Sequence, residues 1–269
     1  MSPRKRIIHL IQSLGSGGCE HMLLRTLPLL QEFEHTIITL KELGELAPQF
    51  ALNGISVHTV HCRSFFDIPG IFRLRKLIKE EGSDVVITYL FHADMLGRLA
   101  LHGTTQSPII PFLRTTYNHP RYWIARLFER LTQSLTQQYL ANSEAVKTFY
   151  TEYIGVLKEK ITVIPNGIDT EYFDSLVPDP TLRLSLGIGL NDFVIICVAN
   201  FHPNKGHRYL LEAFEKLHST NSHAPLKLLL VGEGTERKKL EQQIQGYASK
   251  ANMLFLGRRT DVPALLKIS

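Results

Sequence analysis

Residues 6–20 have the sequence RIIHLIQSLGSGGCE, in which an apolar run is followed by a glycine-rich turn and then by helical spacing. Apolar runs that alternate with helical segments build parallel sheets with helices packed on them. The same alternation recurs along the chain, so the sequence predicts an α/β fold. We expect first-half strands at 6–13, 36–40, 56–60, 84–89, 109–113, 138–141 and 161–164, and helices at 20–31, 69–80, 93–102, 120–136 and 143–153.

A change of composition divides the chain. Residues 176–191 contain two proline and two glycine positions without periodic spacing, which predicts a linker. We therefore expect a first α/β domain at 1–175 and a second at 192–269. In the second domain the pattern predicts strands at 193–199, 226–231 and 253–256, and helices at 207–218, 236–247 and from 262 onward.

The composition is that of a globular chain. Its 269 residues are 44% apolar and 20% charged, with a formal net charge of +5. No apolar run approaches the roughly 18 to 20 residues of a membrane span, and the run after the basic N-terminus is shorter than the roughly 7 to 15 residues of a signal peptide. Cys19, Cys62 and Cys197 are too far apart for a disulfide framework, which fits a reducing cytoplasmic location.

The chain ends at residues 265–269, within an apolar helical pattern that has no cap. The second domain has only three expected strands, and such a sheet leaves an edge and an apolar flank uncovered. The sequence therefore predicts a fragment in which the second domain is incomplete.

The turn after the first strand contains Gly17 and Gly18 and opens a helix. Glycines let the backbone approach a ligand, and free N–H groups at a helix N-terminus attract an oxyanion. The spacing is not that of a dinucleotide fingerprint, and a plain tight turn is the alternative.

In the second domain three more turns follow expected strands. Lys205 and Gly206 stand directly before a helix, where the lysine can neutralise a diphosphate as a point charge. The other two turns are Gly232-Glu233-Gly234 and Gly257-Arg258. Because ligands of open α/β sheets bind at the carboxyl ends of the strands, these turns outline a nucleotide-sized pocket.

His92 is the histidine that we expect to have a chemical role. It follows a strand directly, where a loop faces the ligand, and it is a candidate for contact with a reacting sugar. No histidine or cysteine spacing supports a metal site, and no serine-hydrolase elbow is present. A structural role is the better interpretation for the histidines on strands or helix surfaces, namely His9, His35, His58, His61, His102, His218 and His223.

Taken in order, these motifs resemble retaining glycosyltransferases of family 4, which have the GT-B fold. The most specific feature is Ile164-Pro165-Asn166-Gly167-Ile168-Asp169, followed about forty residues later by Lys205-Gly206-His207. The likeness also includes residues 17–20, 91–100, 141–143, 231–234 and 255–257.

The resemblance implies two Rossmann-like domains facing a cleft, one for the acceptor and one for a nucleotide sugar. By position, Gly17 and Gly18 would approach the donor diphosphate and His92 would contact the donor sugar. Lys205, with Gly206, would pair with the diphosphate, whereas Gly232, Glu233, Gly234, Gly257 and Arg258 would border the nucleoside. The resemblance implies catalysis without a metal or other cofactor, and retention at the anomeric carbon.

Two departures from the family pattern affect these expectations. Asn200 stands where many members have an arginine that joins the lysine at the diphosphate. The family's pair of glutamates that bind ribose and sugar would lie beyond Ser269. We therefore expect this chain to bind donor weakly and to transfer sugar poorly or not at all, and an intact parent to be active.

The expected acceptor is a polysaccharide, a lipopolysaccharide or a lipid-linked glycan. Basic residues at 4–6 and 73–79, with Phe65, Phe66 and Phe72 alongside, suggest peripheral contact with an anionic membrane at its inner face, although an ordinary amphipathic helix explains them equally well. The alternatives are a non-catalytic scaffold of a glycan-assembly complex and another GT-B enzyme such as a nucleotide-sugar epimerase. Nucleic acid is not an expected partner, because the basic residues are scattered.

Overall fold

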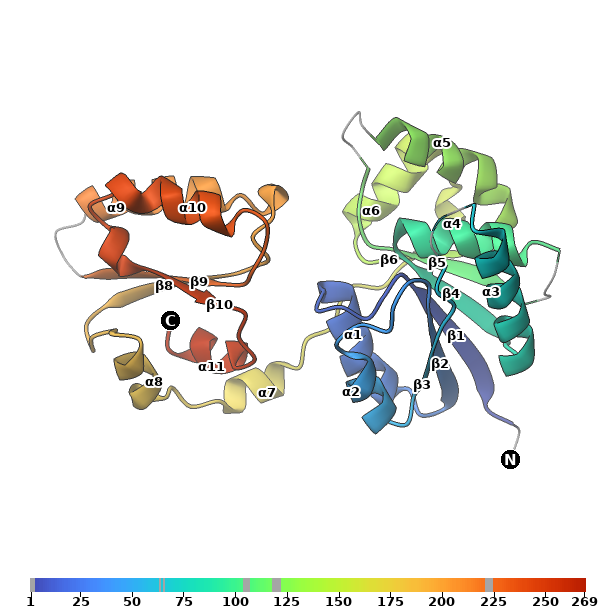
Figure 1. The fold of residues 1–269 in the computed structure, drawn as a ribbon, viewed down its shortest axis with the longest axis horizontal. Helices are drawn as coiled ribbons and strands as arrows, with labels where there is room; N and C mark the ends of the chain where they lie inside the picture. The colour runs from blue at the N-terminus through green and yellow to red at the C-terminus, as the bar shows by residue number, and fades with distance from the viewer. Residues whose placement is uncertain (1–2, 63, 65, 104–106, 118–121, 221–224) are drawn as a thin grey trace. The chain divides into compact units, whose positions relative to one another are not determined.

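The computed structural model describes residues 3–62, 64, 66–103, 107–117, 122–220 and 225–269. The chain divides into two units, Met1–Gly167 and Ile168–Ser269. Each unit is built on one sheet with helices packed against it (Figure 1). The predicted α/β class is therefore confirmed in each unit.

Over the described residues the first unit has a seven-stranded parallel sheet, in the order β3-β2-β1-β4-β5-β6-β7. The order reverses between β1 and β4, and ligands of such sheets bind beside the switch point. The strands are β1 (Lys5–Ile11), β2 (Phe33–Thr39), β3 (Ser56–Thr59), β4 (Val85–Tyr89), β5 (Ile109–Leu113), β6 (Tyr139–Ala141) and β7 (Ile161–Val163). The α-helices are α1 (Gly18–Thr26), α2 (Ala47–Leu52), α3 (Ile68–Glu81), α4 (Leu90–Leu101), α5 (Trp123–Thr132) and α6 (Glu144–Phe149).

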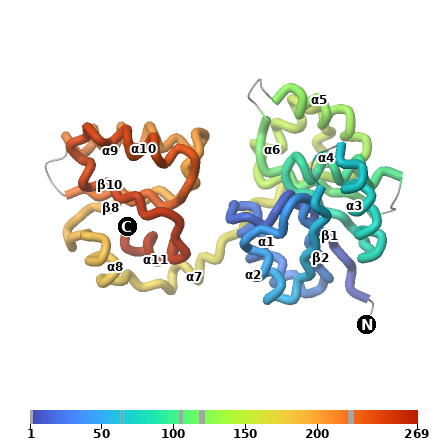
Figure 2. Tube along the Cα trace, viewed as in Figure 1, coloured from blue at the N-terminus to red at the C-terminus, as the bar shows by residue number. Residues whose placement is uncertain are grey.

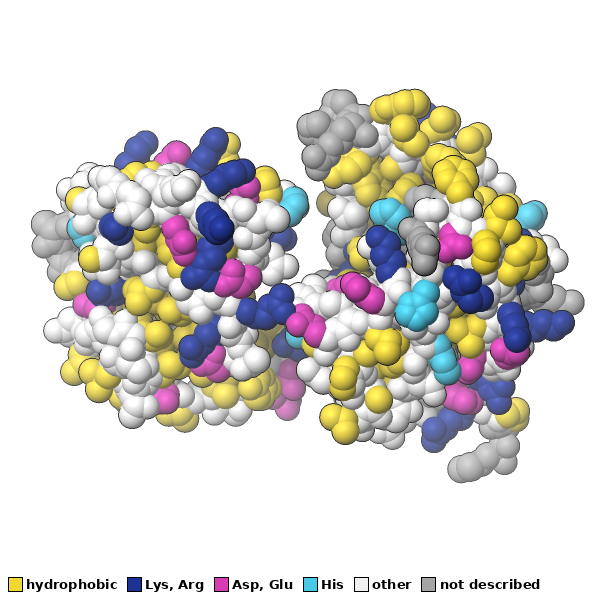
Figure 3. All heavy atoms as spheres, viewed as in Figure 1, with side chains coloured by type: hydrophobic (Ala, Val, Ile, Leu, Met, Phe, Trp, Pro, Cys, Tyr) yellow, Lys and Arg dark blue, Asp and Glu magenta, His cyan; other side chains and the backbone are white. Residues whose placement is uncertain are grey.

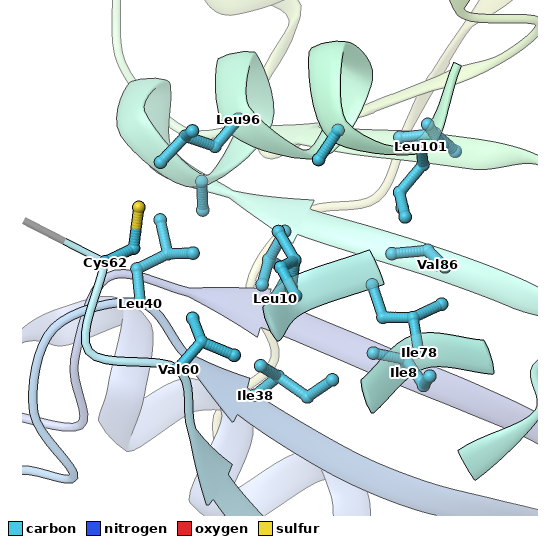
Figure 4. Close-up of a cluster of buried hydrophobic side chains, with 14 residues drawn as sticks. Ile8, Leu10, Ile38, Leu40, Val60, Cys62, Ile78, Val86, Leu96 and Leu101 are labelled. Carbon is cyan, nitrogen blue, oxygen red and sulfur yellow. The ribbon is translucent and has the colours of Figure 1, made fainter. Parts of the chain in front are cut away.

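Both faces of this sheet are buried. Ile8 and Leu10 of β1 point to the face covered by α3 and α4, where they meet Ile78 and Leu96 (Figure 4). Ile11 points to the opposite face, which α1 and α2 cover. The alternation along one strand therefore supplies two cores, as a doubly covered sheet requires.

Among its described residues the second unit has a three-stranded parallel sheet in the order β10-β9-β8. The strands are β8 (Phe193–Val198), β9 (Leu226–Val231) and β10 (Met253–Gly257). The helices are α7 (Thr170–Ser175), α8 (Pro180–Ser185), α9 (His207–Thr220), α10 (Arg237–Gln243) and α11 (Val262–Lys267), and Figure 2 follows their order along the chain.

Both faces of the second sheet are covered as well. One face packs against Leu211 and Phe214 of α9. The other packs against residues on either side of it in sequence, including Ile188 and Leu265. The sequence predicted an uncovered apolar flank on this sheet. Both faces of the sheet are instead covered, because α11 and the segment before β8 fold back onto the second face.

The structure differs from the predicted elements in four helices. The short helices α2, α7 and α8 were not predicted, and α8 lies inside the range 176–191 that we expected to be a linker. Leu182 and Leu186 there pack on the second core. Helix α4 begins at Leu90, three residues earlier than predicted. Phe65, His223 and the first two residues of the predicted helix 120–136 lie outside the described residues.

Candidate functional site at the carboxyl edges of the two sheets

The turn between β1 and α1 lies at the carboxyl edge of the first sheet. Gly17 is the N-cap of α1 and provides no side-chain cap, so the first N–H groups of the helix keep no side-chain acceptor there. A Cβ on Gly18 would meet no atom within 4 Å, whereas one on Gly17 would lie 2.4 Å from a carboxylate oxygen of Glu20. The turn therefore exposes backbone at Gly18 and is partly covered by Glu20 at Gly17.

His92 lies at the same edge, in the first turn of α4 and not in a loop as predicted. No loop separates β4 from α4, because Leu90 takes a left-handed conformation with φ of 66° and turns the chain directly into the helix. Such a conformation is strained for a residue with a branched side chain and is often found at functional sites. The His92 side chain is exposed. Partial burial and the charge of Lys41 lower its pKa, so the imidazole is neutral near pH 7.

His9 and His35 are structural, as predicted. His35 Nε2 is 3.1 Å from the Leu30 carbonyl, His9 Nε2 is 3.0 Å from His35 Nδ1, and His9 Nδ1 is 2.9 Å from the Tyr89 hydroxyl. In this row of hydrogen bonds, each ring nitrogen of His9 and His35 has a donor or acceptor partner if both imidazoles carry their proton on Nε2. Burial and the neighbouring His35 lower the pKa of His9 to about 3. His9 therefore stays neutral and fixes the end of β4.

A buried ion cluster anchors α4. The Arg98 guanidinium donates to both carboxylate oxygens of Asp94, at 2.8 and 2.5 Å, and lies 3.0 Å from a carboxylate oxygen of Glu129 on α5. Thr88 of β4 donates to Asp94, and Tyr150 donates to Glu129. Burial raises the pKa of Glu129 to about 7. The motif that the sequence analysis noted around residue 98 thus holds the His92 helix to β4 and α5.

Arg114 follows β5 at the same edge and was not identified from the sequence. Its guanidinium lies over the Phe112 ring, 5.2 Å from the ring centre. Its Nη1 is buried and has no hydrogen-bond partner among the described residues. Arg114 lines, with Tyr117 and Glu129, a small pocket of about 10 Å³, which is room for about one water molecule. A cation directly after a strand was the signal that could have revealed it.

Another pocket of about 600 Å³ in the first unit lies between α2 and β3. It is lined by Leu43, Ala47, Ile55 and neighbouring residues, and none of the predicted site residues reaches it.

In the second unit the structure brings the three predicted turns together. Phe201 N donates to the Glu233 carbonyl at 2.9 Å, and Gly232 N donates to the Gly257 carbonyl at 2.9 Å. The turns approach so closely that a Cβ on Gly232 would lie 2.1 Å from the Ala199 carbonyl oxygen. Because Gly232 has φ of 143°, the position favours glycine on both counts. The carboxyl ends of β8, β9 and β10 thus form one hydrogen-bonded edge.

Lys205 lies at this edge, in a short 3₁₀ helix before α9, and its side chain is exposed. Gly206, in the left-handed conformation with φ of 71°, redirects the chain into α9. His207 behind it is buried, and burial and Lys205 lower its pKa. Asn200, at the position where many family members have arginine, is exposed at the same turn.

Among the remaining predicted residues, the Glu233 carboxylate pairs with Arg237, which also donates to Glu241 at 2.8 Å. Arg258 is exposed, and the Arg259 beside it pairs with Asp261 at 2.6 Å. The Glu233 carboxylate is therefore engaged in an ion pair, and the Gly232 N–H and the Glu233 and Gly257 carbonyls are engaged in the hydrogen bonds that join the turns.

The described part of the chain contains no cluster of three or more histidine, cysteine or acidic side chains that could hold a metal ion. None of its helices is long and apolar enough to cross a membrane.

The chain is similar to glycosyltransferases that act on lipid-linked substrates. It is 27% identical to the Escherichia coli UDP-Gal:alpha-D-GlcNAc-diphosphoundecaprenol alpha-1,3-galactosyltransferase over 94% of this chain and 68% of that enzyme. It is 23% identical to the Acholeplasma laidlawii alpha-monoglucosyldiacylglycerol synthase over 93% of this chain and 64% of that enzyme. The chain thus spans about two thirds of the length of these relatives.

The fold matches a solved structure over nearly the whole chain. Anabaena HepE in complex with UDP and glucose superposes with a TM-score of 0.80 and 22% identity, covering 98% of this chain and 72% of that one. The predicted GT-B fold class is confirmed by this likeness. Two family models match consecutive parts of the sequence. The model named Glycosyl transferases group 1 matches residues 179–269. The other model, Glycosyltransferase Family 4, matches residues 16–172, more than half of the sequence, and the chain belongs to this family of glycosyltransferases.

Proposed function

We propose that the protein transfers a sugar from a nucleotide sugar, with retention of anomeric configuration, to a lipid-linked glycan. The observation that carries this proposal is the match of both units to glycosyltransferase family models. The names of the relatives support a lipid-linked acceptor, since one acts on a diphosphoundecaprenol-linked sugar and another makes a glycosylated diacylglycerol. The UDP bound to HepE supports a uridine nucleotide as donor.

Lys205 is the proposed diphosphate ligand. In the reaction the bond from the anomeric carbon to the diphosphate oxygen breaks, a bond to the acceptor hydroxyl oxygen forms, and the hydroxyl proton passes to the leaving diphosphate. An exposed ammonium beside the N-terminus of α9 stabilises the charge that develops on that leaving group. Because Lys205 supplies this charge, we propose that transfer needs no metal ion.

The joined turns of the second unit are the proposed nucleoside site. Their backbone is fixed by the hydrogen bonds from Phe201 N to the Glu233 carbonyl and from Gly232 N to the Gly257 carbonyl. A rigid edge of this kind binds a flat base and a ribose without paying to order loops. Gly234 and Arg258 border the same edge, and we assign them the same role.

The first unit supplies the proposed acceptor side. His92, neutral near pH 7, donates or accepts a hydrogen bond at the transferred sugar without placing a second positive charge there. Gly18 leaves its backbone open to an oxygen of the donor, and Gly17 does so if the Glu20 carboxylate moves aside. His92 is held by a helix that the Arg98 cluster anchors, which gives the contact a fixed geometry.

A transfer assay tests this function. The full chain is incubated with radiolabelled UDP-sugars or GDP-sugars of α configuration and a polyprenyl-diphosphate-linked acceptor, and the product anomer is determined by NMR. We expect an α-linked product, formed at the low rate that the sequence analysis predicts for this chain. A β-linked product contradicts retention, and the absence of both sugar transfer and binding of UDP or GDP contradicts the function.

The matched variants are Lys205→Gln and Lys216→Gln, the second on the exposed face of α9. Loss of a charge-assisted contact predicts about a 10- to 100-fold lower rate for Lys205→Gln and an unchanged rate for Lys216→Gln. Equal rates for the two variants would remove Lys205 from the site.

A further inference from the structure

Helix α5 has its polar face buried and its apolar face exposed. Glu129 and Thr132 are buried at 1% and 7% exposure, where they join the Arg98 cluster. The side chains on the opposite face are large, apolar and exposed: Trp123 (59%), Ile124 (49%), Leu127 (45%), Phe128 (44%) and Leu131 (69%). A helix on the surface of a water-soluble domain normally has the reverse orientation.

The five side chains form one continuous stripe. They stand at helical spacings of three to four residues along α5, so they share a single face about 12 Å long. Figure 3 shows apolar side chains gathered over this helix. Tyr153, whose side chain is 55% exposed, belongs to a segment that contacts α5, because its carbonyl accepts hydrogen bonds from Arg130 at 2.6 and 3.2 Å. The stripe itself contains two aromatic side chains, those of Trp123 and Phe128.

The two charged side chains on the surface of α5 itself are both positive. These are Arg126 and Arg130, and both donate to backbone carbonyls. A carbonyl acceptor is uncharged, so these contacts do not neutralise the two positive charges. The acid of this helix, Glu129, is buried against Arg98. An apolar stripe with arginines and with aromatic residues is the composition that lies in the boundary of an anionic bilayer.

The helix α3, which the sequence analysis connected with a membrane, is different. Its Leu74 and Ile78 are buried in the core, so its apolar face points inward. Arg73 donates to backbone carbonyls and lies 3.8 Å from Asp67, and Lys76 pairs with Glu80. Helix α3 therefore has an apolar face in the core, although Phe66 before it and Ile68 and Phe72 on it remain exposed, and membrane contact by this helix stays a prediction.

We infer that the exposed face of α5 is a docking surface for an anionic lipid bilayer, into which its five apolar side chains insert. A second copy of the chain is a poorer occupant, because a stable protein interface takes about 20 to 30 residues a side and this stripe has five. The biological role of this surface, which is to bring the first unit to an acceptor held in the membrane, rests on the proposed function. The exposure of the apolar side chains on α5 does not depend on that function.

The single tryptophan of the chain makes the inference directly measurable, since Trp123 lies in the stripe. The full chain is titrated with vesicles of phosphatidylethanolamine and phosphatidylglycerol, and with vesicles of phosphatidylcholine alone, with no donor or acceptor present. We expect a blue shift of the tryptophan emission, and quenching by brominated acyl chains, with the anionic vesicles. An unchanged emission spectrum would overturn the inference.

Flotation with two matched double variants locates the surface. Ile124→Ser with Leu131→Ser removes two side chains from α5 and keeps Trp123, whereas Ile68→Ser with Phe72→Ser removes two equally exposed side chains from α3. We expect at least about tenfold weaker vesicle binding for the α5 variant and less than about twofold for the α3 variant. Equal binding by both variants would overturn the inference. So would a blue shift that appears without lipid as protein concentration rises, because that result assigns the stripe to a second copy.

These experiments separate the inference from the proposed function. Vesicle binding with neither sugar transfer nor binding of UDP or GDP retains the docking surface and rejects the function. Sugar transfer to a detergent-dispersed acceptor without vesicle binding retains the function and rejects the docking surface.

Discussion

Gly232 illustrates how single residues set the geometry of the second edge. A Cβ there would lie 2.1 Å from the Ala199 carbonyl oxygen, closer than any van der Waals contact allows. The turn after β9 can therefore hydrogen-bond to the turn after β8 only with glycine at this position. The turn was predicted from its composition, but the composition does not show that both Gly232 and Gly234 have the backbone of the turn after β8 against them.

Replacement of this glycine tests the argument. Gly232→Ala is expected to destabilise the chain by about 2 kcal/mol or more, because both the positive φ and the close approach oppose a side chain. The matched control is Gly246→Ala, where a Cβ meets nothing within 4 Å. Urea unfolding of both variants gives the two free energies. A Gly232→Ala protein as stable as the control would show that the turns are not packed as described.

His92 shows what the sequence could and could not give at this scale. Its place after β4 was predicted from the strand that precedes it, and the structure confirms that placement. The helix that contains it was predicted to begin three residues later, because a pattern of apolar residues does not reveal that Leu90 adopts φ of 66°. The role of His92 at the sugar stays a prediction.

At the scale of elements, the cluster between α4 and α5 contains one cation and two carboxylates. Arg98, Asp94 and Glu129 are 0%, 3% and 1% exposed. Because Asp94 accepts both hydrogen bonds of the guanidinium fork and a third from Thr88, Glu129 is the carboxyl that holds a proton most readily. Burial accordingly raises the pKa of Glu129 to about 7.

The pH dependence of stability follows with a definite sign. Between about pH 4.5 and 7 the unfolded chain loses the Glu129 proton and the folded chain keeps it, so this group's contribution to stability is complete below the unfolded pKa and is lost as the pH rises through 7. Relative to the unmodified chain, Glu129→Gln should therefore gain on the order of 2 kcal/mol between pH 5 and 8.

Urea unfolding at several pH values measures this difference, with Glu144→Gln on the exposed face of α6 as the control. The control curve should run parallel to that of the unmodified chain. A Glu129→Gln curve that also ran parallel would show that Glu129 is ionised throughout the range.

The prediction of elements succeeded for the strands and missed three short helices. All ten strands of the described chain were predicted within about three residues at each end, because each is a run of apolar and β-branched residues. The helices α2, α7 and α8 have six residues each, too few to show a 3.6-residue period, and α2 and α8 carry proline near their start. The range of α5 was predicted, but its inverted orientation was not, since the pattern shows an apolar face without showing which way it points.

At the scale of the whole molecule, the succession of two parallel α/β units was predicted from the sequence. Residues 176–191 were predicted to be a linker from their prolines and glycines. Leu182 and Leu186 in this range nevertheless belong to the core of the second unit. The expectations of a longer parent and of a glutamate pair beyond Ser269 stay predictions.

Removal of metal ions is a test at this scale. If Lys205 and the amides of the second edge carry the charge of the leaving diphosphate, chelation with EDTA should change the transfer rate by less than about twofold. The rate is measured with and without added Mg²⁺ or Mn²⁺ after chelation. A rate that falls to background and returns with either ion would contradict the charge assignment.

The central claim is that the joined turns of the second unit, with Lys205, bind a nucleoside diphosphate. Calorimetric titration of UDP into the full chain and into its Lys205→Gln variant tests it most directly. The account predicts saturable binding of UDP that is about 10- to 100-fold weaker in the variant. Equal affinity in the two proteins, or no heat with either UDP or GDP, would contradict it.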